Sequence, residues 1–114
     1  MKYLWLACLM AGALLCGTPA AAQETPAQRE ARHHFDLAAI RAAANFRSAA
    51  SIDARLQKDG QVLHPQLTAL RMRIEAALSE ARFEMDQHDY PEAEDALTRA
   101  DALLDRFARQ IGGY

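Results

Sequence analysis

Apolar residues recur at three- and four-residue steps through the C-terminal part of the chain, as they do along one face of an α-helix. The recurring positions are Ala93, Leu97, Ala100, Leu104, Phe107 and Ile111. Most of the residues between them are charged or polar and would face water on the other side of the helix. Asp89 with Glu92 forms a capping box at the start, and the glycines at 112–113 mark the end. The segment 89–111 is therefore predicted to be an amphipathic helix that needs partners.

The first predicted helix covers residues 26–58. Thr25 and Gln28 have the spacing of a capping box around Pro26, a residue type that is favoured in the first turn. Gly60 follows two polar residues and is a typical residue after a helix end. At 1.5 Å per residue this helix would be about 50 Å long, longer than either partner.

A second helix is predicted over 65–87, with Pro65 at its first turn. Its apolar stripe consists of Leu67, Leu70, Ile74, Leu78, Ala81 and Met85. No segment shows the apolar–polar alternation of a strand. The expected fold is all-α, a small antiparallel three-helix bundle with up-down-up topology, in which the first helix is the longest unless it breaks near Ser48 or Ser51.

Residues 1–22 are predicted to be a signal peptide that is removed after Ala22, leaving a single helical domain over 23–114. Lys2 is followed by an uncharged, mostly apolar run of 13 residues and then by small residues before the cut. Such a run is shorter than the roughly 20 residues that a membrane-spanning helix needs. The protein is therefore expected to be periplasmic or secreted.

Cys16 raises the alternative of a lipoprotein, in which a lipid-bearing cysteine anchors the chain to a membrane. The residue before such a cysteine is normally small, whereas here it is Leu15, so cleavage after Ala22 is favoured. Cys8 and Cys16 both lie in the predicted signal peptide. The mature protein is then expected to contain no disulfide and to depend on apolar burial for its stability.

Charge is distributed unequally among the predicted helices. Residues 25–58 carry six basic and three acidic side chains, whereas residues 89–114 carry six acidic and three basic ones. Opposite charges favour packing of the first helix beside the third, although an exposed pair contributes only about 0 to 1 kcal/mol. The alternative is that these charges simply face solvent.

The passage from the second to the third helix resembles a tetratricopeptide repeat over about residues 75–108. Asp89 and Tyr90 match the start of the second helix of that repeat, with Ala93, Leu97 and Ala100 on its packing face and Ala81 at a small position of its first helix. Several positions depart from the repeat: His88 replaces a glycine, Glu80 and Glu84 replace apolar residues, and Asp105 replaces a proline. The resemblance implies a single antiparallel helical hairpin, because no second copy follows.

Two of the predicted helices carry a second apolar stripe opposite the first. The additional positions are Leu37, Ile40 and Ala44 on the first helix and Met72, Ala76 and Phe83 on the second. A helix in a minimal three-helix bundle needs one apolar stripe, so a second stripe indicates a surface for a protein partner or a second copy. The alternative is that a kink or a rotated packing buries these residues within one molecule.

Histidines near the start of the first helix suggest a metal site. Glu30 and His34 are four residues apart and share one helix face, while His33 and Asp36 are three apart and share another. Either pair supplies two ligands, whereas a closed zinc site takes four, so further ligands would have to come from a dimer. Histidines that simply face solvent are the alternative interpretation.

Other functional classes have little support in the sequence. It contains no nucleophile motif, glycine-rich phosphate loop or C-x-x-C pair, so a non-enzymatic protein without a cofactor is predicted. Residues 23–114 carry 12 basic and 15 acidic side chains, a balance that does not favour nucleic-acid binding. The basic first helix is a candidate for weak contact with an anionic envelope surface.

The sequence thus predicts an exported helical protein that acts through protein–protein association, with itself or with an envelope partner. Periplasmic metal binding or buffering through His33 and His34 is the alternative function. No stable membrane span is expected in the mature chain.

Overall fold

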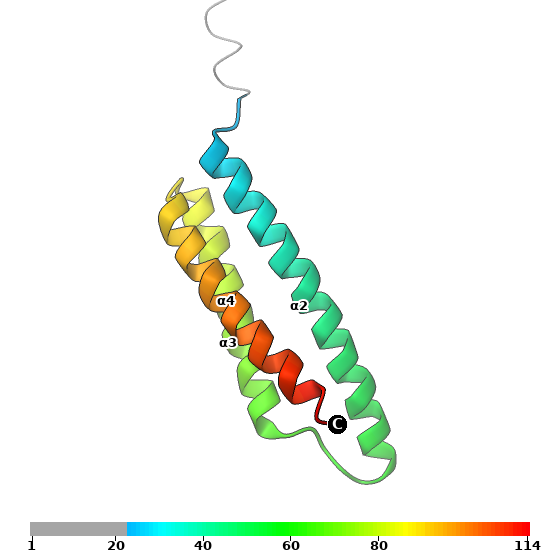
Figure 1. Ribbon diagram of the computed structural model, residues 1–114. Helices are drawn as coiled ribbons and strands as arrows, with labels where there is room; N and C mark the ends of the chain where they lie inside the picture. The colour runs from blue at the N-terminus through cyan, green and yellow to red at the C-terminus, as the bar shows by residue number, and fades with distance from the viewer. Residues whose placement is uncertain (1–22) are drawn as a thin grey trace, which may run out of the picture.

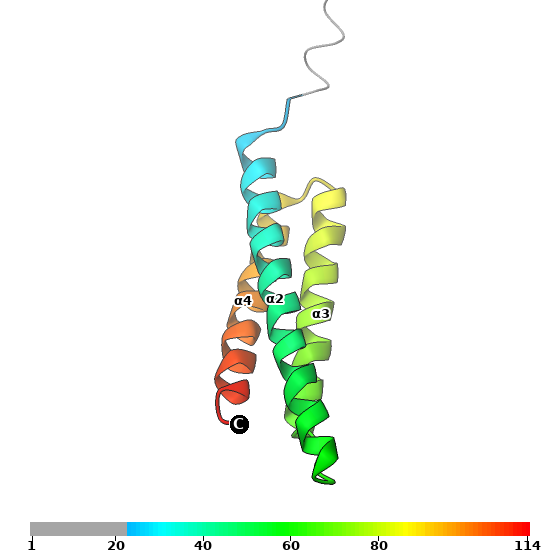
Figure 2. The ribbon, with the colours of Figure 1, turned by 90° about the vertical axis from the view of Figure 1, so that its right-hand side faces the viewer.

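The computed structural model describes residues 23–114, which form three α-helices (Figure 1). These are Pro26–Lys58 (α2), Pro65–Asp86 (α3) and Tyr90–Ile111 (α4). Helices α2 and α4 run in the same direction and α3 runs antiparallel to both (Figures 1 and 2). The prediction of a small all-α, three-helix bundle is confirmed, with helix bounds within one residue of those expected. The predicted signal peptide lies outside the described residues.

Two of the helices begin at the predicted capping residues. The Thr25 hydroxyl accepts a hydrogen bond of 3.2 Å from the backbone N–H of Gln28, at the start of α2. The Asp89 carboxylate accepts one of 3.3 Å from the backbone N–H of Glu92, at the start of α4. Each bond satisfies a donor that the first helical turn leaves without a partner.

His64 caps α3, a role that the sequence analysis did not assign to it. Its ring Nδ1 accepts a hydrogen bond of 3.1 Å from the backbone N–H of Gln66. Its own backbone N–H donates to the Tyr114 hydroxyl at 2.9 Å, so the C-terminal residue is fastened to the loop that joins α2 and α3.

Helix α2 is continuous over its 33 residues and does not break at Ser48 or Ser51. The Ser48 hydroxyl donates to the Ala44 carbonyl at 3.2 Å, which satisfies the side chain without interrupting the helix. The helix ends in a Schellman motif, in which the N–H of Gly60 bonds to the Gln57 carbonyl and the next N–H bonds to the Leu56 carbonyl. Gly60 has φ 71°, a left-handed conformation that glycine adopts without strain.

Helix α3 ends in the same motif, but with a histidine in the left-handed position. The N–H of His88 bonds to the Met85 carbonyl at 3.0 Å, and the N–H of Asp89 bonds to the Glu84 carbonyl at 2.8 Å. His88 has φ 59°. A left-handed residue with a Cβ costs roughly 1–2 kcal/mol, so this turn is formed at a cost that the turn at Gly60 avoids.

The core is built from unequal contributions by the three helices. The buried residues of α2 are Ala31, Ala38, Ala42, Ala49 and Ile52. The largest fully buried side chains all come from the other two helices: Leu67, Leu70 and Ile74 from α3, and Leu97, Leu104 and Phe107 from α4. The alanines allow the backbone of α2 to lie close to the bulkier side chains of the α3–α4 hairpin.

Phe46 provides the main aromatic contact between α2 and the hairpin. Its ring lies edge-on to that of Phe107, with centroids 5.4 Å apart, a geometry favoured by the aromatic quadrupole. The guanidinium of Arg71 lies 4.7 Å from the centroid of the Phe46 ring, so all three helices meet at this side chain.

The apolar stripes predicted for α3 and α4 form the core. Their innermost positions are buried, while Leu78, Met85 and Ile111 at the margins are half-buried. No helix within residues 23–114 combines the length and apolar character required to cross a membrane.

The turn at His88 generates a prediction about stability. His88→Gly should raise the free energy of unfolding by up to about 1 kcal/mol, because relief of the left-handed strain exceeds the entropic cost of glycine. Chemical denaturation of residues 23–114 provides the measurement.

Gln87→Gly is the matched control, since Gln87 precedes His88 and has φ −85°. Glycine there relieves no strain and should lower stability. Equal destabilisation by both substitutions would contradict the assignment of strain to His88.

Candidate association surface and histidine clamp

The second apolar stripes predicted for the first two helices, α2 and α3, are exposed in the bundle. The side chains of Leu37, Ile40, Met72 and Phe83 are 54%, 67%, 66% and 59% exposed, respectively. Ala44 and Ala76 are exposed as well. The alternative in which a kink or rotated packing buries these residues within one molecule is therefore wrong, because α2 is continuous and its alanine face points inward.

These six residues form two patches, each carried by one helix. Leu37 and Ala44 share a helix face with Arg41, because they lie four residues before it and three residues after it, respectively. Arg41 pairs with Asp105 of α4, so the α2 patch lies toward the α4 side of its helix. On α3, Met72 borders the groove toward α2 and Ala76 borders the groove toward α4. The α3 patch, which also contains Phe83, is thus the outer ridge of that helix.

The predicted pairing of the basic and acidic helices occurs in the structure. Arg41 of α2 forms an ion pair with Asp105 of α4. The hydrogen bond from Arg41 and its positive charge hold the pKa of the Asp105 carboxyl below its usual value. Both side chains are well exposed, so this pair contributes to the alignment of the helices more than to stability.

His34 forms the second link between α2 and α4. Its Nδ1 lies 2.6 Å from a carboxylate oxygen of Glu94, and its Nε2 lies 2.7 Å from one of Asp101. Glu94 and Asp101 are two turns apart on α4, so they bracket the ring from both sides. An imidazole that meets a carboxylate at each nitrogen satisfies both only when it is protonated and donates twice.

The environment of His34 acts on its pKa in two directions. Partial burial favours the neutral ring and lowers the pKa, but the hydrogen bonds to Asp101 and Glu94 and the charges of these carboxylates outweigh it. The pKa of His34 is consequently raised above its ordinary value of 6.5. We refer to His34, Glu94 and Asp101 as the histidine clamp.

The other residues of the suggested metal site lie apart from this clamp. Glu30, His33 and Asp36 are exposed on α2, while His34 turns toward α4. Within residues 23–114, no three histidine, cysteine or carboxylate side chains are gathered so that they would hold a metal ion. In the described part of the chain, neither of the two-residue pairs suggested by the sequence is therefore completed to a metal site.

Sequence reasoning identified His34 but not its partners. Opposite net charges of the two helices indicated that they pair, but not which residues meet, because that depends on the relative height of α2 and α4. The seven-residue spacing of Glu94 and Asp101 was the available signal, since it puts two carboxylates on one helix face.

Comparisons with protein-family models, with curated proteins and with solved structures find no match to this chain.

The clamp predicts a specific pH dependence of stability. Because the pKa of His34 is raised in the folded state, its contribution is fully present below about pH 6.5 and is lost as the pH rises through the folded pKa. Substitution His34→Asn should therefore lower the free energy of unfolding at pH 5.5, by on the order of 1 kcal/mol, and have a smaller effect at pH 8.5. Denaturant titrations at both pH values measure this difference.

His33→Asn is the matched control because His33 is the exposed neighbour of His34 on the same helix. It should show no such difference between the two pH values. A pKa of His34 at or below its ordinary value of 6.5 in an NMR titration would contradict the clamp.

Proposed function

We propose that this protein is exported and acts without catalysis, by associating with a second copy of itself or with another envelope protein. The observation that carries this proposal is the exposure of Leu37, Ile40, Met72 and Phe83, which are the large apolar side chains exposed on α2 and α3. Large apolar groups clustered on a soluble helix are typical of surfaces that become buried in a complex.

Rigidity supports the same proposal. The two patches lie on continuous helices of 33 and 22 residues, so binding would not require the side chains to be positioned by a new backbone conformation. An interface that uses pre-positioned side chains loses less conformational entropy on association. Such helices suit an isologous contact, in which the same patch of two copies meets, or a contact with a helical partner.

Export is supported by the character of residues 1–22, with a basic start, a short apolar run and small residues before position 23. The protein recovered from the periplasm or medium is predicted to begin at Gln23. Intact-mass measurement of the exported protein tests this, with Ala22→Arg as a variant that should slow or prevent cleavage. A mass that includes residues 1–22, or a lipid attached at Cys16, would contradict the predicted cleavage.

Association through the α3 patch should be abolished by the double substitution Met72→Glu and Phe83→Glu. Burying two carboxylates in an apolar contact is expected to weaken association at least about tenfold, while helix content by circular dichroism stays unchanged. Sedimentation velocity measures self-association, and crosslinking in intact cells measures contact with a partner.

The double variant Leu37→Glu and Ile40→Glu tests the α2 patch in the same way. Gln61→Glu with Gln87→Glu is the matched control, since it adds the same charge at exposed positions at the ends of the bundle. If both patch variants keep the oligomeric state and crosslinks of the unmodified protein, neither patch is an interface.

A further inference from the structure

A groove runs between α3 and α4 on the face of the hairpin away from α2. It carries charged side chains that the proposed association does not use. Its volume is about 430 Å³. The lining residues are Arg73, Ala76, Ala77 and Glu80 from α3 and Arg99, Ala102, Leu103 and Arg106 from α4. A volume of this size lies within the range of pockets that bind small molecules.

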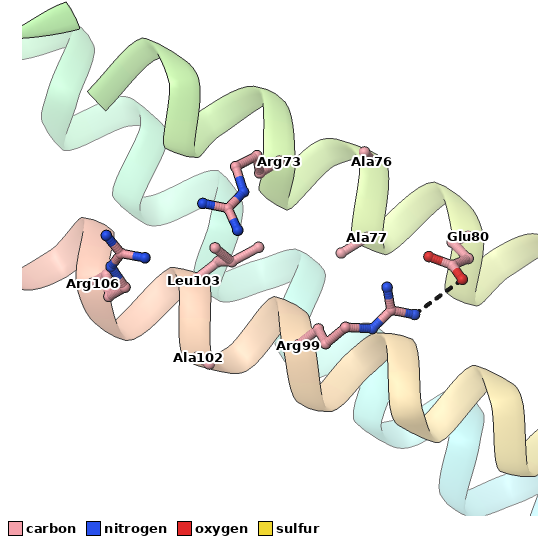
Figure 3. Close-up of a pocket in the computed structure, with 8 residues that line it drawn as sticks. All are labelled: Arg73, Ala76, Ala77, Glu80, Arg99, Ala102, Leu103 and Arg106. Carbon is pink, nitrogen blue, oxygen red and sulfur yellow. Dashed lines mark hydrogen bonds and ion pairs between the residues drawn. The ribbon is translucent and has the colours of Figure 1, made fainter. Parts of the chain in front are cut away.

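The two ends of the groove differ in charge. At one end, the guanidinium groups of Arg73 from α3 and Arg106 from α4 lie near Leu103 (Figure 3). Within residues 23–114, neither of these arginines forms an ion pair. At the other end, Arg99 donates to Glu80 at 3.0 Å, so the two charges there compensate one another. The groove therefore has one cationic end and one end without net charge.

The floor between these ends is apolar. Ala77 and Leu103 form it, while Ala76 and Ala102 border the groove from the outer edges of α3 and α4 (Figure 3). The seven-residue step from Arg73 to Glu80 corresponds to about 10 Å along the helix. The small alanine side chains keep this strip recessed between the two helices, so a narrow apolar chain fits it better than a flat surface does.

From these features we propose that the α3–α4 groove binds a single-chain organic anion, a carboxylate attached to an unbranched apolar tail. The guanidinium groups of Arg73 and Arg106 hold the carboxylate, since each offers paired N–H donors that match its two oxygens. The tail lies along Leu103 and Ala77 toward the Arg99–Glu80 pair. Glu80 disfavours the reverse orientation of the ligand, because the carboxylate of the ligand would then lie near the Glu80 carboxylate.

A second copy of the chain is a less suitable occupant of this groove. A contact in which the cationic ends of two molecules meet would bring Arg73 and Arg106 close to the same arginines of the second copy, and like charges at an interface oppose association. The recessed strip between the helices also distinguishes this site from the outer ridge formed by Met72 and Phe83.

The test uses decanoate, below its micellar concentration, with ¹⁵N-labelled protein comprising residues 23–114. Decanoate should bind saturably at one site and shift the amide signals of Ala76, Ala102 and Leu103. Acetate, which has the same head group without a tail, and decyltrimethylammonium, which has the same tail with a cationic head, should bind at least about tenfold more weakly. Equal binding of decanoate and either of these probes would overturn the proposal.

Substitution of both arginines, Arg73→Gln with Arg106→Gln, should weaken decanoate binding at least about tenfold. The matched control is Arg47→Gln with Arg82→Gln, which removes the same charge at exposed positions outside the groove and should leave binding unchanged. Equal weakening by both double variants would show a general charge effect and overturn the proposal.

Leu103→Asp provides an independent variant that keeps all the arginines. The new carboxylate lies between the two helices and should exclude the apolar tail, whereas unchanged decanoate binding would contradict the assignment of the tail to this strip. Vesicles of phosphatidylglycerol test whether the two arginines instead contact the anionic surface of a membrane. Binding to these vesicles without binding to decanoate would identify a membrane-surface site and overturn the single-chain assignment.

Discussion

The structure depends on the close packing of the alanine face of α2 against the α3–α4 hairpin. Apart from Ile52, the side chains that α2 buries are alanines, so most of the buried volume comes from leucine, isoleucine and phenylalanine of the hairpin. Apolar burial contributes in proportion to the area removed from water, and an alanine removes little. The hairpin is consequently the better-filled part of the core, and α2 needs additional interactions to fix its position.

Those interactions are aromatic and electrostatic. Phe46 reaches from α2 to Phe107 and is covered by Arg71 of α3, which ties the three helices together at one level. Toward the other end, His34 lies between two carboxylates of α4. An alanine face by itself permits sliding by a helical turn, since its positions are nearly equivalent. The histidine clamp and the Phe46 contact break that equivalence and define the relative height of α2 and α4.

The same arrangement determines which surfaces remain for binding. Because the side of α2 that faces the core consists mainly of alanines, Leu37 and Ile40 of this helix face water. Met72 and Phe83 on α3 face water as well. The third side of the bundle, between α3 and α4, has a different character, with an apolar strip beside two arginines. The bundle thus presents exposed apolar side chains on two helices and a groove with one cationic end.

The sequence by itself determined the secondary structure and the fold class. The apolar periodicity of α4, the caps at Thr25 and Asp89, and Gly60 after α2 are local signals, and each depends only on residues within a few positions of one another. The exposed patches also followed from the pattern, since one helix face suffices for the core. What only the tertiary structure decided are relations between helices: the partners of His34, the role of Tyr114 at the loop, and the position of Arg73 and Arg106 along one groove. These depend on the rotation and relative height of packed helices, which the side chains of all three set together.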